Sequence, residues 1–188
     1  MVEIHLVGIG ATKLPAGLGM PPPIGFIMAG LAGALDPSLR IGDVVIDDCP
    51  GEFLPHAQCR AGKIVTSKTI VATPSEKRLL FEKTGALAVD MESAVVRAVA
   101  AKLNVPFVSI RAISDAAGES LDPAVLRMVD KFGNPRLIDL AFAIIGKPAL
   151  IPRLVRLGRS SNVAAKNLAA AVFSIVRQWS EIEPAPTD

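Results

Sequence analysis

The chain has 188 residues, of which 51% are hydrophobic and 20% are charged, so it can form one domain with a substantial core. The net charge of +2, without basic runs interleaved with aromatic residues, argues against nucleic-acid binding. Cys49 and Cys59 have no CxxC spacing, which predicts free thiols in a reducing cytoplasm. His5 and His56 are too few to predict a zinc site.

The N-terminus does not resemble a secretory signal, because Glu3 stands in place of a basic region. The apolar run that follows is interrupted by Gly8, Gly10 and Lys13. No stretch reaches the roughly 18 uncharged apolar residues that a membrane span needs. We therefore expect a cytoplasmic protein.

The first two thirds of the chain alternate between strand-like and helix-like segments. Strands are expected at residues 2–7, 26–30, 44–47, 63–71, 86–91 and 105–114, glycine turns at 8–10 and 30–43, and loops at 14–25 and 49–62. A helix is expected to follow Thr73 as N-cap, with Pro74 at its first position, Glu76 completing a capping box and Gly85 ending it. A second helix is expected at 92–104, and Asp122–Pro123 begin another. This alternation predicts an α/β fold.

Beyond residue 136 the pattern predicts helices alone. Three are expected, at residues 136–146, 148–158 and 161–179, separated at Gly146–Pro148 and at Gly158. Residues 1–180 are expected to form a single domain, and residues 181–188 a flexible tail.

Two glycine-rich segments could bring backbone close to a ligand. "GIGATK" at 8–13 lacks the third glycine of a dinucleotide-binding motif, since Lys13 stands there, and no GK[ST] of a P-loop is present. A glycine turn after a strand can still offer N–H groups to an anion, although a plain tight turn explains it equally well. Gly30 and Gly33 in "AGLAGAL" form a second, weaker candidate.

The strongest signal is a pair of segments in which polar residues follow apolar runs. At the end of one predicted strand, "VDMES" carries Asp90, Met91 and Glu92. At the end of another, "SIRAISDAAG" carries Arg111, Ser114 and Asp115. In open α/β sheets ligands bind beyond the carboxyl ends of the strands. One carboxylate there can accept hydrogen bonds from sugar hydroxyls, and another can act as a general acid. Alternatively, Glu92 only complements a helix dipole and Asp115 only caps the next segment.

These residues resemble a known family. "VDMESAVVRAVAAKLNVPFVSIRAISDAAG" at 89–118, "GLAGALDPSLRIGDVVI" at 30–46 and "GIG" at 8–10 are similar, in family order, to the purine nucleoside and uridine phosphorylases. That family includes the methylthioadenosine/S-adenosylhomocysteine nucleosidases. The segment beginning "GKPALIPRLVRLG" at 146 further resembles hopanoid-associated phosphorylases that act on adenosylhopane. The resemblance implies a three-layer α/β/α fold with a central mixed sheet and a helical C-terminal region.

The resemblance also implies a role for each matching residue in cleaving the N-glycosidic bond of a purine nucleoside or nucleoside-like substrate. Glu92 would hold the ribose hydroxyls, Met91 would pack under the sugar, and Asp115 with Ser114 would protonate or hydrogen-bond purine N7. The remaining roles are base contact by Ile70 and Val71, a border to the phosphate or water site by Gly8, Gly10 and Gly30, and orientation of a carboxylate by Arg111. No cofactor is implied beyond inorganic phosphate as co-substrate. Asp90 is expected to help cap the following helix.

The anion side matches the family less well. Family members have a strand and a helix before the first glycine turn, where seven residues stand here, and the water-activating acid of the nucleosidases lies in that portion. Lys13 is the nearest cation to the turn, and Leu31 replaces a usual Ser or Thr. Phosphorolysis is the leading expectation. The alternatives are a nucleosidase that uses water and a non-catalytic nucleoside-binding relative.

Two further expectations concern partners. The mean hydropathy of +0.44 predicts apolar surface that a homo-oligomer would cover. Apolar residues interleaved with arginines between Leu150 and Arg159 could form a helix that contacts an anionic membrane or a lipid-like substrate. An ordinary amphipathic surface helix explains the same pattern.

Overall fold

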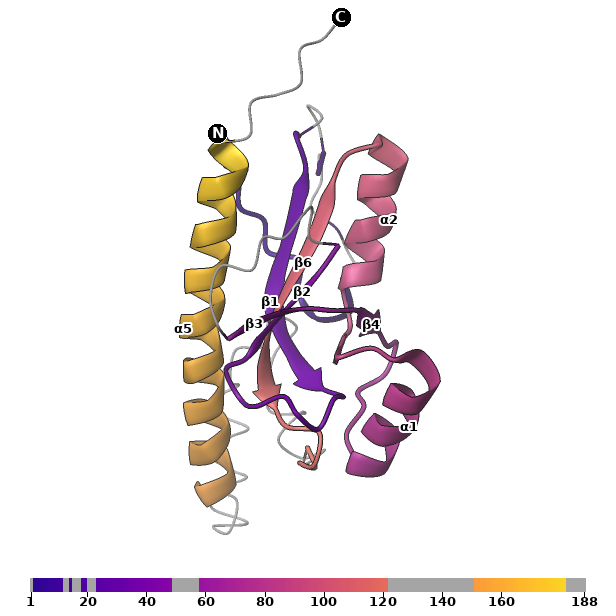
Figure 1. Ribbon diagram of the computed structural model, residues 1–188, viewed down its shortest axis with the longest axis vertical. Coiled ribbons are helices and arrows are strands. Elements are labelled where there is room, and N and C mark those ends of the chain that lie inside the picture. The colour runs from indigo at the N-terminus through magenta and orange to yellow at the C-terminus, as the bar shows by residue number, and fades with distance from the viewer. Residues whose placement is uncertain are drawn as a thin grey trace, which may run out of the picture.

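The computed structural model describes residues 2–11, 14, 18–19, 23–48, 58–121 and 151–181. Its strands are β1 (Phe26–Ala34), β2 (Val44–Asp47), β3 (Cys59–Ala61), β4 (Ile64–Thr66), β5 (Ala88–Asp90) and β6 (Phe107–Asp115). Its helices are α1 (Pro74–Thr84), α2 (Ser93–Leu103), α5 (Ile151–Glu181) and the short 3-10 helix η1 (Ile9–Ala11). The sheet, in the order β3-β2-β6-β1-β5-β4, separates α5 on one side from α1 and α2 on the other (Figure 1). The predicted α/β fold with a mixed sheet between helical layers is confirmed.

The centre of the sheet is the parallel pair β1 and β6. Their register runs from Phe26 opposite Phe107 to Ala32 opposite Ile113, and an irregularity then places Gly33 opposite Asp115. Strand β5 pairs with the other edge of β1 in the antiparallel direction, and β2 pairs with β6 antiparallel. As predicted, the apolar strand β6 is flanked by a strand on each side, and its residues are almost all buried.

The two faces of β6 differ in chemistry because alternate side chains point to opposite sides of a sheet. On one face, small and branched residues pack against α5; this cluster includes Val108, Ile110, Ala112, Ala164, Ala171 and Ile175. On the other face Ser109, Arg111 and Asp115 bond to residues of α2 and α1. The polar residues of β6 therefore lie on the α1/α2 face.

Helix α1 begins as predicted. Thr73 accepts a hydrogen bond from the backbone N–H of Glu76, and the Glu76 side chain accepts one from the Thr73 backbone N–H at 2.9 Å. Gly85 ends the helix in a left-handed conformation at φ 63°. The hydrogen bond from the Thr73 backbone is the main reason why the pKa of Glu76 is lowered from its ordinary value.

Because of this capping box, we expect the stability of the protein to depend on pH. The variant Glu76→Gln should remove part of that dependence. A carboxylate with a lowered folded-state pKa stabilises the fold above its unfolded-state pKa, and the contribution is lost as the pH falls through the folded-state pKa. We expect wild type to be more stable than Glu76→Gln at neutral pH, and the difference to shrink in acid. Urea unfolding of both proteins at neutral and acidic pH measures this; a difference independent of pH would contradict it.

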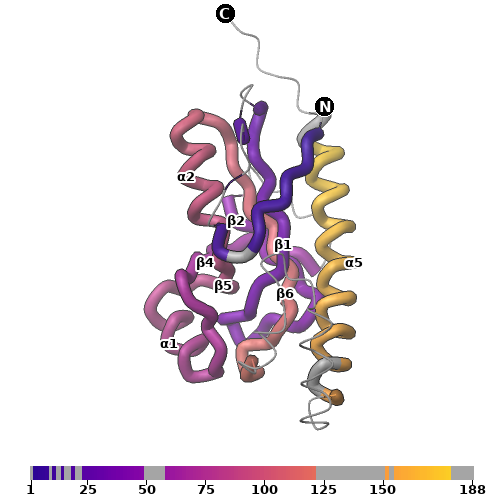
Figure 2. Tube along the Cα trace, turned by 180° about the vertical axis from the view of Figure 1, so that it is seen from behind, coloured from indigo at the N-terminus to yellow at the C-terminus, as the bar shows by residue number. Residues whose placement is uncertain are grey.

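The structure corrects several predicted boundaries. Residues 2–7 form an irregular segment in place of the predicted strand and lead to η1 near the N-terminal end of α2 (Figure 2). No strand among the described residues pairs with this segment, and Val2, Ile4 and Leu6 are exposed. Residues 30–34, predicted as a turn, continue β1, since the glycines face the large side chains of β6. Residues 59–61, predicted as a loop, form β3 beside β2. Residues 67–71, predicted to continue a strand, follow the end of β4.

The C-terminal correction is a single helix in place of two. Helix α5 runs without a break through Gly158, where it was predicted to be interrupted. A glycine inside a helix costs only about 1 kcal/mol relative to alanine. Packing of Ala164, Ala171 and Ile175 against the sheet outweighs that cost.

Some predictions fall outside the described residues. They concern Lys13, Cys49, His56, Leu150, the helices expected at 122 onwards and 136–146, and the tail at 182–188. Among the helices that the structure describes, none is both long and apolar enough to cross a membrane.

Candidate functional site

A buried arginine organises a polar cluster on the α1/α2 face of the sheet. Arg111 is 2% exposed, and its Nη2 lies 2.6 Å from Asp90 Oδ2. The same nitrogen donates to Ser93 Oγ at 3.1 Å and lies 3.6 Å from Glu92 Oε2. Arg111 thus connects the end of β5 to the start of α2, and its guanidinium lies beside the Glu92 carboxylate.

Asp90 has a structural role, as predicted. Its Oδ2 accepts a hydrogen bond from the backbone N–H of Ser93 at 3.1 Å, which satisfies a donor in the first turn of α2. Its Oδ1 accepts from Thr66 Oγ1 at 2.8 Å. The hydroxyls of Ser93 and Ser109 lie 2.7 Å apart and extend the network to the middle of β6. The Asp90–Arg111 pair is therefore buried and largely hydrogen-bonded.

Glu92 lies at the edge of this cluster and touches the first glycine turn. Its Oε1 accepts a hydrogen bond from the backbone N–H of Gly10 at 2.8 Å. Gly8 and Gly10 both have φ near 74°, the left-handed conformation that glycine adopts without strain. A carboxylate has about four lone-pair positions, so Glu92 keeps acceptor capacity beyond these contacts.

Asp115 forms a second centre at the end of β6. One oxygen, Oδ1, accepts from Ser114 Oγ at 2.8 Å, and the other, Oδ2, lies 2.6 Å from Lys77 Nζ on α1. Asp115 is 5% exposed and Lys77 is fully buried. The Ser114 hydroxyl oxygen also lies 3.3 Å from the carbonyl oxygen of Ala32 on β1. Asp115 is thus an oriented carboxylate with a buried ammonium beside it.

Two glycines of β1 make room for the charged side chains of β6. A Cβ at Gly30 would lie 1.9 Å from Arg111 Nη1, and a Cβ at Gly33 would lie 3.0 Å from Asp115 Oδ2. Gly30 was predicted to border the phosphate; the structure places it opposite Arg111. The glycines of "AGLAGAL" therefore serve close packing of side chains against a strand.

Gly30→Ala is expected to destabilise the protein by about 1–3 kcal/mol, the usual cost of overpacking. The guanidinium of Arg111 cannot move aside easily because Asp90 holds it at 2.6 Å. Urea unfolding measures the loss. Gly118→Ala is the matched control, since a Cβ there would meet nothing within 4 Å. Equal stability of the two variants would contradict the packing argument.

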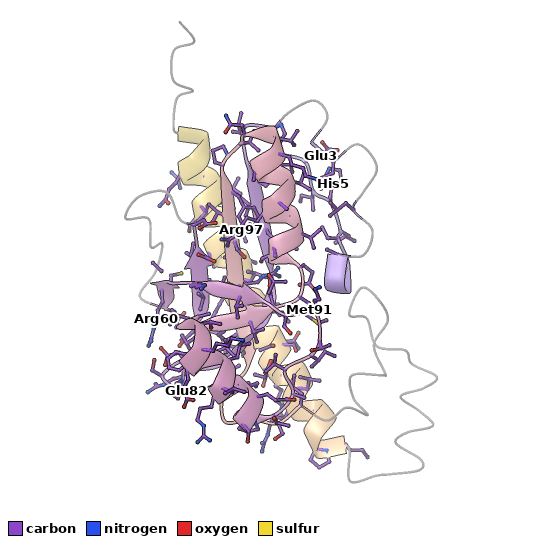
Figure 3. The ribbon with its side chains drawn as sticks, turned by 90° about the vertical axis from the view of Figure 1, so that its right-hand side faces the viewer. Glu3, His5, Arg60, Glu82, Met91 and Arg97 are labelled. Atoms are coloured by element: carbon purple, nitrogen blue, oxygen red, sulfur yellow. The ribbon has the colours of Figure 1, made fainter. Side chains whose placement is uncertain are left out.

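Three other residues, Met91, Ile70 and Val71, were predicted to contact the substrate. Met91 is half-buried at the junction of β5 and α2 (Figure 3). Ile70 is 43% exposed, whereas Val71 packs partly against the core residues Leu35, Ala86 and Val89. Neither Ile70 nor Val71 is on a strand, because β4 ends at Thr66.

The predicted residues meet by a different route from the one expected. They were expected at the carboxyl ends of neighbouring strands, but β5 and β6 flank β1 and run in opposite directions. Glu92 follows β5, and Arg111 and Asp115 belong to β6, so β1 lies between the strands that carry these residues. The long side chain of Arg111 extends from β6 to Asp90 and Glu92.

Sequence reasoning did not find Lys77, Ser93 and Ser109 as members of the site. Lys77 lies on a helix rich in charged residues, and Ser93 and Ser109 lie within or beside apolar runs, so none shows a distinctive pattern. Within the described ranges, no group of three or more His, Cys, Asp or Glu side chains could hold a metal ion.

Comparisons with known proteins indicate the family that the chain resembles. The family model described as "Phosphorylase superfamily" matches residues 51–141, just under half of the chain. A 5'-methylthioadenosine/S-adenosylhomocysteine nucleosidase of Tolumonas auensis is 31% identical, with 49% of this chain and 56% of that protein aligned. The chain therefore spans little more than half the length of this relative. These matches confirm the resemblance to the nucleoside phosphorylase family.

Solved structures confirm the fold. The methylthioadenosine/S-adenosylhomocysteine nucleosidase of Colwellia psychrerythraea, solved in complex with adenine, gives a TM-score of 0.60 at 19% identity, covering 92% of this chain and 75% of that chain. The S-adenosylhomocysteine nucleosidase of Streptococcus pyogenes, solved with 5-methylthiotubericidin, gives 0.58 at 18% identity, covering 86% and 71%. The chain has the fold of these nucleosidases.

Proposed function

We propose that the chain belongs to an enzyme that cleaves the N-glycosidic bond of a purine nucleoside or nucleoside-like substrate, with inorganic phosphate as the attacking group. One observation carries the proposal. Two oriented carboxylates, Glu92 and Asp115, lie on the α1/α2 side of the sheet and flank β1, and Glu92 touches the backbone of the first glycine turn. The names of the similar proteins support a nucleoside as the substrate class.

Glu92 would bind the ribose. Its Oε1 is already oriented by the N–H of Gly10, and its Oε2 lies near the guanidinium of Arg111. The remaining lone pairs can accept hydrogen bonds from two neighbouring hydroxyls of a sugar. Arg111 would keep the carboxylate in the right orientation, and the thioether of Met91 suits an irregular apolar surface under the ring.

Asp115 would act on the leaving base. As the bond between the base and the anomeric carbon breaks, its electron pair moves to the base, and a proton delivered to purine N7 neutralises the developing charge. Ser114 orients Asp115 through a 2.8 Å hydrogen bond. Phosphate would attack the sugar from the side of the glycine turn, where the backbone N–H of Gly8 could contact an anion. The N–H of Gly10 beside it is donated to Glu92.

Release of purine base from a panel of nucleosides tests the proposal, and the panel should include one with a long apolar 5' substituent as a model of adenosylhopane. Each substrate is assayed with and without phosphate. We expect adenine release that depends on phosphate, together with formation of a sugar 1-phosphate. Release at the same rate without phosphate would show that water is the nucleophile. Binding of adenine without any release would favour the non-catalytic alternative.

A further inference from the structure

We propose that Lys77 is a positioning residue for Asp115, which fixes the orientation of that carboxylate toward the leaving base. This inference rests on the proposed function, because it assigns to Asp115 the role of proton donor to the leaving base. Lys77 was not among the residues that the family resemblance assigned to the site.

The burial of Lys77 is unusual for its residue type. Lysine is almost never fully buried unless it is paired, yet Lys77 has 0% of its surface exposed. On the same helix Leu79 is 66% exposed. Helix α1 lies beside the lower part of the sheet in Figure 1. The capping box at Thr73 fixes the start of this helix shortly before Lys77. The helix thus presents an ammonium group where a helix ordinarily presents an apolar residue.

All three hydrogen-bond donors of this ammonium are used on the end of β6 and the turn after it. Lys77 Nζ donates to Asp115 Oδ2 at 2.6 Å, to the carbonyl of Ala116 at 2.8 Å and to the carbonyl of Glu119 at 3.1 Å. Ser114 binds the other oxygen of Asp115. With both oxygens held, the carboxylate cannot rotate freely, and the turn that follows it is tied to the same group.

Lys77 is also the cation that faces Asp115. The Arg111 guanidinium, on the same strand, forms its ion pairs with Asp90 and Glu92. The Glu119 carboxylate accepts a hydrogen bond from the backbone N–H of Ala116. Among the described residues, the ion pair given for Asp115 is therefore the one with Lys77. Removing Lys77 would therefore leave Asp115 without this partner.

Lys77→Met tests the inference, because methionine has a similar length and no charge. Steady-state base release is measured for the variant, for wild type and for Lys83→Met, which removes an exposed lysine from the same helix. We expect Lys77→Met to lower kcat on the order of 10²-fold, with a small change in KM, because Asp115 is no longer held in place. Lys83→Met should keep the kcat and KM of wild type.

A Lys77→Met protein with the kcat of wild type, or with a raised KM and an unchanged kcat, would overturn the inference. If this variant does not fold, Lys77→Arg is measured in its place, because arginine keeps the charge but has a different shape. The inference then expects a lowered kcat with a small change in KM, and a wild-type kcat would overturn it. If wild type releases no base, the proposed function fails separately. The affinity of wild type and Lys77→Met for adenine then decides: the inference expects weaker binding by the variant, and equal affinity overturns the role of Lys77.

Discussion

Replacing Asp115 with asparagine is expected to lower kcat for base release by about 10²- to 10⁴-fold, the usual contribution of general acid–base catalysis. Asparagine keeps the size of the side chain and can still accept a hydrogen bond from Ser114, but it cannot deliver an acidic proton to purine N7. Steady-state kinetics with adenosine measure the effect. The loss should appear in kcat more than in KM, because the proton is needed mainly in the transition state.

Asp36→Asn is a matched control for that experiment. Asp36 lies in the turn after β1, where its carboxylate accepts a hydrogen bond from the backbone N–H of Ser38, a contact that asparagine can reproduce. We expect this variant to keep wild-type turnover. Unchanged turnover by Asp115→Asn would remove Asp115 from the mechanism and leave its ion pair with Lys77 a purely structural feature.

Replacing Arg111 with methionine is expected to lower the free energy of unfolding by about 3–5 kcal/mol, the usual cost of breaking a buried ion pair by removing one partner. Arg111 is 2% exposed and lies 2.6 Å from a fully buried side chain, that of Asp90. Without the guanidinium, the Asp90 carboxylate would remain in the interior with an uncompensated charge. Urea unfolding measures the difference.

The double variant Arg111→Met with Asp90→Leu separates charge from packing. Removing both charges should recover a large part of the stability lost in Arg111→Met, because a well-packed apolar pair can replace a buried ion pair at little cost. The double variant should still lack activity, since Glu92 loses the guanidinium 3.6 Å away. A loss below about 1 kcal/mol for Arg111→Met, the range of surface pairs, would contradict the account.

Local sequence signals predicted the elements whose structure depends mainly on neighbouring residues. Helix α1 was predicted from Thr73, Pro74, Glu76 and Gly85, and each acts as expected. The apolar run of β6 predicted a strand at the centre of the sheet. These signals are reliable because caps and periodicity act within one or two turns of the chain.

Contacts between distant segments decided the features that the sequence did not predict. Gly30 and Gly33 were predicted to lie in a turn because glycine usually marks one. In the structure they make room for the side chains of Arg111 and Asp115, some 80 residues later in the chain. Lys77 was not singled out from the sequence, because its partner Asp115 lies on another element. The segment 2–7 alternates like a strand but has no strand to pair with in the described structure.

The candidate site residues could be named from the sequence because they belong to two motifs of specific composition. Glu92, Arg111 and Asp115 each stand at the end of, or just after, an apolar run, and such a position is informative without any tertiary contact. Their distances, their partners and the antiparallel arrangement of β5 and β6 required the three-dimensional structure.

The most direct test of the account is a crystal structure of the protein with a nucleoside analogue that resists cleavage, such as formycin A. The account predicts that the ribose hydroxyls lie within hydrogen-bond distance of Glu92 and that the base lies against Asp115, on the α1/α2 side of the sheet. An analogue bound elsewhere, or one whose sugar makes no contact with Glu92, would contradict the central claim that these two carboxylates form a nucleoside-cleaving site.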